Sequence, residues 1–231
     1  MTHTNTTILT SDELYRLIVD NIKLASTRCD DFSVLNASLL YNICPRGCHL
    51  IYQNKLLIHQ SEKPVDDGLK LVFKMGWKIE EIINEALAHC HIKIPLLTWK
   101  VGHFTIKGHP DIVIENNGNL YILEIKSISL EQFKLLQQPI YKHEHQLLTY
   151  LLLAKKNKLN IAQGFLVYVS KGYWRPPIKI YPISLTKTFE QQFRQFAKGL
   201  RNQTMPDRVC ASQVHAELTN CPVKDLCFQC Q

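Results

Sequence analysis

The stretch GHPDIVIENNGNLYILEIKS, residues 108 to 127, decides the fold of this chain. Two mostly apolar runs flank Asn117 and Gly118, and an Asn-Gly pair between such runs is the strongest short-range signal of a two-residue hairpin turn. Counted outward from that turn, each residue of the first run has one partner in the second. The stretch therefore predicts an antiparallel hairpin in which Asp111 faces Glu124.

Each of the two runs carries an acid. Side chains directly opposed on a hairpin have Cβ atoms about 4.5–5.5 Å apart, and Lys126, two residues beyond Glu124, points to the same face. Two carboxylates held so close, in partial burial, repel each other and resist ionising together. A hard divalent cation such as Mg²⁺ or Mn²⁺ relieves this repulsion, because carboxylate oxygens are ligands that suit it. The alternative interpretation is a surface hairpin with scattered charge and a salt bridge to Lys126.

The other face of the hairpin is apolar and is expected to enter a core; it consists of Ile112, Ile114, Tyr121, Leu123 and Ile125. Periodicity elsewhere predicts further elements. The expected helices cover 11–28, 69–91, 143–157 and 185–201, and the expected strands cover 97–107, 163–170 and 177–183. In the helix over 69–91, the apolar face is expected to include Trp77, Ile83 and Leu87. This order indicates an α/β or α+β core with a mixed sheet.

Composition is that of an ordinary globular protein. The 231 residues are 45% apolar and 20% charged, and no apolar run approaches the roughly 20 residues of a membrane span. The chain is expected to be soluble, intracellular and cytoplasmic, with no membrane partner. The formal charge of +7 fits an anionic partner, although simple solubility explains it equally well. Eight cysteines without a secretion signal indicate reduced thiols, some of which could bind metal.

The order HPD, twelve residues, then EIK resembles the PD-(D/E)xK nuclease signature, with Pro110, Asp111, Glu124 and Lys126 in its defining places. The next predicted helix contains Gln146 and Tyr150, four residues apart on one helix face. This Q-x-x-x-Y arrangement is similar to that of the RecB-like branch of the superfamily. The resemblance implies a restriction-endonuclease-like α/β core, a mixed central sheet flanked by helices.

The resemblance also implies roles at the catalytic site. Asp111 and Glu124, with the main-chain carbonyl of Ile125, would hold one or two Mg²⁺ or Mn²⁺ ions, and Lys126 would orient the attacking water. A third ligand of the family is commonly a histidine four residues after a glycine; here GWKIE supplies Gly76 and Glu80 instead. Glu80 would be that ligand, and a solvated glutamate at the helix edge is the alternative. Gln146 and Tyr150 would position the DNA strand, and His143, one turn earlier, is a weaker candidate.

The cysteines resemble those of the iron–sulfur subgroup of RecB-like nucleases, in which an early Cys-Pro-Arg joins three C-terminal cysteines. This implies a [4Fe–4S] cluster on Cys44, Cys221, Cys227 and Cys230, with Cys210 as a competing ligand and zinc as the alternative metal. The spacing of the last three cysteines departs from that subgroup, so the ligand set stays open. The remaining cysteines are expected to be free buried thiols. A single nuclease domain over 1–231 would thus have a core at about 69–200, with parts at about 11–60 and 205–231 forming a metal-stapled cap.

By resemblance, the expected activity is metal-dependent hydrolysis of DNA, most of all as a single-strand exonuclease in recombination, repair or CRISPR adaptation. Recombination, helicase or CRISPR-adaptation proteins are the implied partners. Lys155, Lys156, Lys158, Lys171 and Arg175 could contact phosphates, although a lysine run after a helix is also typical of a solvated end. Two other functions stay open: a non-catalytic nucleic-acid-binding module and a zinc-binding interaction protein.

Overall fold

The structure is a computed structural model that describes residues 9–19, 37, 46–47, 50, 67–101, 104–202, 205–208, 210–212 and 223–229. Its centre is a four-stranded sheet with the strand order β3-β4-β5-β6. The strands are β3 (Ile112–Asn116), β4 (Asn119–Ile128), β5 (Ile161–Ser170) and β6 (Ile178–Ile183). β4 and β5 are parallel, whereas the two outer pairs are antiparallel. The expected mixed sheet is confirmed.

The hairpin predicted from the Asn-Gly turn is present in the expected register. Ile112 pairs with Leu123 and Asn116 with Asn119. Asn117 and Gly118 have φ values of 52° and 78°, as a turn with two left-handed central residues requires. The residue pair that follows Ile112 and Leu123 outward is Asp111 and Glu124, so the hairpin brings the two acids together as expected.

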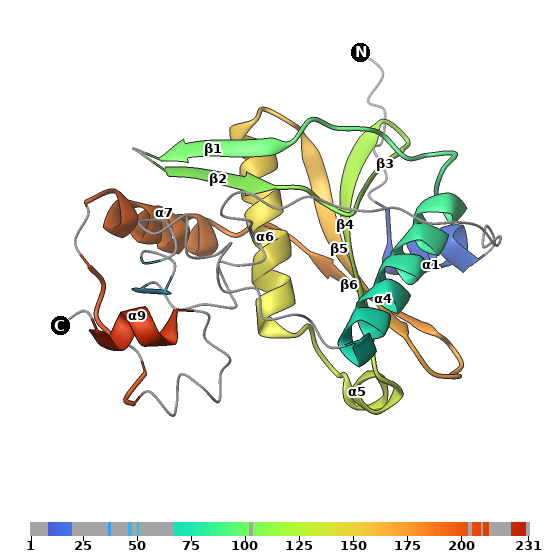
Figure 1. Ribbon diagram of the computed structural model, residues 1–231. Helices are drawn as coiled ribbons and strands as arrows, with labels where there is room; N and C mark the ends of the chain where they lie inside the picture. Colours follow the sequence, from blue (N-terminus) through green and yellow to red (C-terminus); the bar gives the residue numbers. More distant parts are fainter. Residues whose placement is uncertain are drawn as a thin grey trace, which may run out of the picture.

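Helices cover both faces of the sheet (Figure 1). On one face, α1 (Ser11–Val19) and α4 (Asp67–Ala86) pack Leu14 and Ile83 against the apolar face of the hairpin, and Leu87, just beyond α4, joins them. On the other face, α6 (Tyr141–Lys156) lies along the sheet, and α7 (Lys187–Arg201) packs beyond it. Both faces are therefore buried, and Glu124 of β4 points to the face that α6 covers.

The single strand expected over 97–107 is wrong. The structure has two strands there, β1 (Leu97–Val101) and β2 (Phe104–Gly108), which pair with each other in a separate two-stranded sheet. Apolar residues alternate with polar ones in each strand, but they fall at odd numbers in β1 (Leu97, Trp99 and Val101) and at even numbers in β2 (Phe104 and Ile106). This change of phase marks the reversal, and the prediction of one strand overlooked it. This small sheet packs on the outer side of α6 and α7, where the Trp99 ring stacks on Phe193.

The helix expected over 69–91 begins at Asp67 and ends at Ala86. Beyond it, the chain pairs with the outer edge of β3: His91 bridges Ile114, and the Ile92 amide donates to the Val113 carbonyl at 2.8 Å. Trp77 was expected on the buried face but is 47% exposed. Gly76 faces Ser127 of β4, and Trp77, the next residue, points about 100° around the helix axis from it, away from the sheet.

Two short helices complete the described elements, α5 (Leu130–Leu135) and α9 (Lys224–Gln229). Ser129 caps α5 by accepting a hydrogen bond from the Gln132 amide, while the Gln132 side chain accepts one from the Ser129 amide. Of the helix expected over 11–28, residues 11–19 are helical and residues 20–28 lie outside the described residues, as does most of the expected cap at about 11–60. Within the described part of the chain, no helix combines the length and the apolar character that crossing a membrane requires.

Candidate active site

Three side chains of the hairpin meet at the centre of the sheet. Glu124 is fully buried on β4, and the Lys126 ammonium lies 2.5 Å from its Oε1. Asp111 precedes β3 and accepts a hydrogen bond of 2.7 Å on Oδ2 from the Ile125 amide. This bond fixes the Asp111 carboxylate beside the strand that carries the other two groups.

Burial and mutual repulsion make the two acids hard to ionise together. Burial, followed by the charge of Asp111, raises the pKa of Glu124 to about 8. Burial also raises the pKa of Asp111, although the Lys126 charge and the Ile125 amide counteract part of this shift. For Lys126, burial alone would lower the pKa, but Glu124 and Asp111 together outweigh it and raise the pKa. The salt bridge to Lys126 that the alternative interpretation includes is present, but its exposed hairpin face is wrong, because Glu124 is fully buried.

The donor set fits a hard divalent cation. Apart from the ion pair with Lys126, neither oxygen of Glu124 has a hydrogen-bond donor in good geometry among the described residues. Buried carboxylate oxygens without donors are costly unless a cation or a proton compensates them. Two adjacent carboxylates are the oxygen ligands that Mg²⁺ and Mn²⁺ prefer.

Glu80 lies on the stripe of α4 that faces β4. It is half-buried, and its charge contributes to the raised pKa of Glu124. Within the described ranges, however, no three His, Cys, Asp or Glu side chains lie close enough together to hold a metal ion. The structure thus places Glu80 near enough for its charge to act on Glu124. The three carboxylates of Glu80, Asp111 and Glu124 do not form one metal-binding group in this arrangement.

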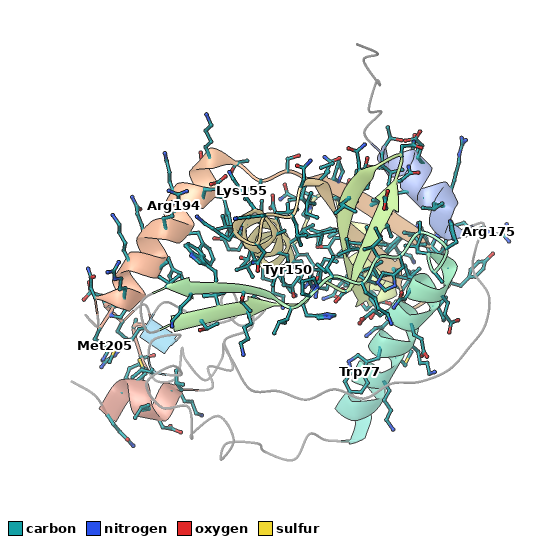
Figure 2. All side chains as sticks on the ribbon, turned by 90° about the horizontal axis from the view of Figure 1, so that it is seen from above. Trp77, Tyr150, Lys155, Arg175, Arg194 and Met205 are labelled. Atoms are coloured by element: carbon teal, nitrogen blue, oxygen red, sulfur yellow. The ribbon has the colours of Figure 1, made fainter. Side chains whose placement is uncertain are left out.

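The Gln146 and Tyr150 pair of α6 faces the acids from the opposite side. The Gln146 Nε2 donates a hydrogen bond of 2.8 Å to the Tyr150 hydroxyl, and both side chains are buried. Burial, followed by the charges of Glu124 and Asp111, raises the pKa of Tyr150. The hydroxyl therefore stays protonated beside the carboxylates and can donate a hydrogen bond. Figure 2 shows Tyr150 near the middle of the molecule.

Tyr168 is a residue of the site that the sequence did not indicate. It is the partner of Lys126 across the parallel β4 and β5 pair, and its hydroxyl lies 3.1 Å from the His143 Nδ1 and accepts a hydrogen bond from the Ile140 amide. Burial, with the charges of Lys126 and Lys142, lowers the pKa of His143 to about 3, so this ring is neutral. Only the pairing of β4 with β5 brings Tyr168 here, and no local motif encodes that pairing.

The basic residues expected to contact DNA do not form one surface. Lys155 pairs with Glu190 of α7 at 2.5 Å, and the Lys156 ammonium lies 5.0 Å from the Trp99 ring. Lys171 and Arg175 belong to the connection between β5 and β6. Figure 2 places Lys155 and Arg175 on opposite sides of Tyr150.

Of the cysteines expected to bind metal, Cys44, Cys221 and Cys230 lie outside the described residues. Cys227 on α9 is buried in the same core as α6, and Cys210 is a half-buried thiol. Arg46, two residues after Cys44, donates a hydrogen bond of 3.1 Å to the Pro206 carbonyl. The early and late parts of the chain therefore meet, as a shared ligand set would require.

Known proteins resemble this chain in sequence pattern and in fold. The model of the PD-(D/E)XK nuclease superfamily matches residues 52–230. The crystal structure of SSO0001 is 19% identical and superposes with a TM-score of 0.55 over 93% of each chain. The alkaline exonuclease LHK-Exo from Laribacter hongkongensis is 10% identical, with a TM-score of 0.51 over 81% of this chain and 91% of its own. No curated protein matches by sequence. At these identities the two structures bear on the fold alone.

Proposed function

The chain belongs to the PD-(D/E)XK nuclease superfamily, and from this premise we propose that it hydrolyses DNA phosphodiester bonds with the help of Mg²⁺ or Mn²⁺. The observation that carries the proposal is the buried Glu124 carboxylate, which lies beside a second buried acid, Asp111, while Lys126 is the one cation that the structure pairs with it among the described residues. Burying two adjacent carboxylates costs stability, and such arrangements occur at functional sites. In a nuclease, a cation bound between the two acids could act on a phosphate.

In this proposal, Asp111, Glu124 and the Ile125 carbonyl hold the metal ion, and Glu80 completes the set on its approach from α4. The bound ion would lower the pKa of a water molecule and stabilise the negative charge that builds on the phosphate. Lys126, a charged donor held by its acidic neighbours, orients the water and counters that charge. Gln146 and Tyr150 donate hydrogen bonds that position the scissile phosphate against the acids.

We further propose that the substrate is a single-stranded DNA end, in recombination, repair or CRISPR adaptation. The motif of Gln146 and Tyr150 supports a RecB-like assignment, and the alkaline exonuclease LHK-Exo shares the fold. The burial of Cys227 and the contact of Arg46 with Pro206 support a cap stapled by an iron–sulfur cluster, with zinc as the other candidate. The phosphate contacts assigned to Lys155, Lys156, Lys171 and Arg175 are part of this proposal.

The test is cleavage of end-labelled single-stranded DNA with Mg²⁺, with Mn²⁺ and with EDTA. Lys126→Ala is expected to lower the cleavage rate at least about 100-fold, as the loss of a charge-stabilising donor does. Its fold and its DNA affinity should stay near those of the parent, because Glu124 can take up a proton once Lys126 is gone. Lys198→Ala, at an exposed position of α7, is the matched control.

Cleavage by Lys126→Ala at the parent rate would show that the assigned mechanism is wrong. A parent protein that binds DNA but cleaves no substrate with either metal would instead favour a non-catalytic binding module. Circular dichroism of each variant separates loss of chemistry from loss of fold.

A further inference from the structure

The connection between β5 and β6, residues 171–177, exposes two aromatic rings next to basic groups. Tyr173 is 79% exposed and Trp174 38% exposed. The Arg175 guanidinium carbon lies 5.7 Å from the centre of the Tyr173 ring, and the Lys134 ammonium of α5 lies 5.0 Å from that of Trp174. These four residues are here called the aromatic platform. The connection itself contains no acidic residue.

The backbone around the platform is held in place at its base. The Ser170 amide donates to the Pro177 carbonyl at 3.1 Å, and the Ser170 hydroxyl donates to the Gly172 carbonyl at 2.8 Å. A Cβ on Gly172 would lie 2.9 Å from the Leu130 Cβ, so glycine lets the connection rest directly against α5. The rings are thus presented to solvent by an ordered loop that packs on a helix.

The platform lies at the end of the sheet towards which the catalytic strand runs. The Lys171 amide donates to the Ile128 carbonyl at 2.9 Å, and Ile128 is two residues beyond Lys126 on β4. At about 3.3 Å per residue, this hydrogen bond is about 7 Å along the strand from Lys126. Figure 1 shows α5 and the β5–β6 connection together at this end of the molecule.

We propose that the aromatic platform stacks unpaired nucleobases of the strand whose phosphate lies at the candidate active site. This inference rests on the proposed function and deepens it by assigning the residues that favour single strands. Aromatic side chains bind bases of any sequence through their faces, and neighbouring cations contact the phosphates. In a duplex, the base faces are already stacked on each other, so the platform discriminates against paired DNA. Arg175 and Lys134 beside the two rings, on a connection that itself has no acidic residue, match a polyanion.

The experiment measures binding of a fluorescein-labelled oligothymidylate of about 20 nucleotides by anisotropy, in EDTA so that no cleavage occurs. Replacing both rings, Tyr173→Ala with Trp174→Ala, is expected to weaken binding about tenfold or more, within the range known for lost base stacking. The matched variant, Tyr173→Phe with Trp174→Phe, keeps both rings and is expected to bind within about twofold of the parent. For a duplex of the same length, the alanine variant is expected to bind with the affinity of the parent.

Single-strand binding by the alanine variant at parent affinity would overturn the inference. An equal loss on single-stranded and duplex DNA would overturn it as well, because it would indicate phosphate contacts alone. The result is independent of catalysis: a parent that cleaves nothing refutes the proposed function, whereas the binding comparison still decides the role of the platform.

Discussion

Glu124 shows how a single buried carboxyl group links stability to pH. Its pKa is about 8 in the folded protein and has an ordinary value of 4.5. Between these values the folded state binds a proton that the unfolded state releases, so stability falls as pH rises. The contribution is complete below about pH 4.5 and is lost as the pH rises through about 8.

We therefore expect the melting temperature of the metal-free protein to fall between about pH 4.5 and about pH 8. A loss of about 1 kcal/mol corresponds to roughly 2–4 °C in a chain of this size. Millimolar Mg²⁺ or Mn²⁺ should restore stability at the higher pH, since a bound cation takes the place of the proton. Thermal melts of the parent and of Glu124→Gln test this; parallel pH profiles for the two proteins would contradict it.

At the same scale, sequence reasoning identified Asp111, Glu124 and Lys126 because a hairpin register follows from its turn. The structure confirms that register and brings Gln146 and Tyr150 to the same place. Tyr168 could not be found in this way. It reaches the site only through the parallel pairing of β4 with β5, and the segments that form that pair are separated by two helices.

Close packing between α6 and β2 depends on one residue without a side chain, Gly108. A Cβ there would lie 2.7 Å from the Tyr150 ring and 2.8 Å from a Leu153 methyl. Gly108→Ala must therefore push α6 away from the strand, and Tyr150 moves with it. We expect a loss of about 1–3 kcal/mol in unfolding free energy, the usual cost of overpacking, measured by urea denaturation.

The control for this change is Gly199→Ala on α7, where nothing lies within 4 Å of the new Cβ. Alanine is the better helix former, so this variant should gain about 0.5–1 kcal/mol. A Gly108→Ala protein as stable as the parent would mean that α6 does not pack on β2 as described.

At the scale of elements, the sequence predicted those helices and strands that begin and end where the periodicity of apolar residues changes. The hairpin, α6, β5 and α7 fall where their periodicities place them. The reversal between β1 and β2 was missed although the alternation changes phase between the two strands. The exposed side of α4 at Trp77 was not predictable, because it depends on which neighbour the helix packs against. Tertiary contacts decide such cases after the local pattern has left them open.

On the scale of the whole molecule, the two ends of the chain are expected to share a metal site that includes Cys227. Cys227→Ser should lose the bound iron or zinc and lower the melting temperature by roughly 10 °C or more, because a structural metal contributes directly to folding. Elemental analysis and visible absorption of protein purified without oxygen provide the measurement; brown protein indicates an iron–sulfur cluster, and colourless protein with zinc indicates the alternative.

Cys90→Ser is the comparison for this prediction, since Cys90 is a half-buried thiol on the other side of the sheet that donates to the Leu87 carbonyl. It should retain the full metal content. If the purified parent protein contained neither iron nor zinc, the proposed metal-stapled cap would be wrong.

The pairing of residues 90–92 with β3 bears on how this molecule behaves at high concentration. An outermost strand normally offers unpaired amide and carbonyl groups on which a second molecule can extend the sheet. Here the Ile92 and Glu115 amides are already engaged along β3, and the opposite border contains Pro182, which has no amide hydrogen. Both borders of the four-stranded sheet therefore offer fewer free amides to a second copy than an uninterrupted outer strand would.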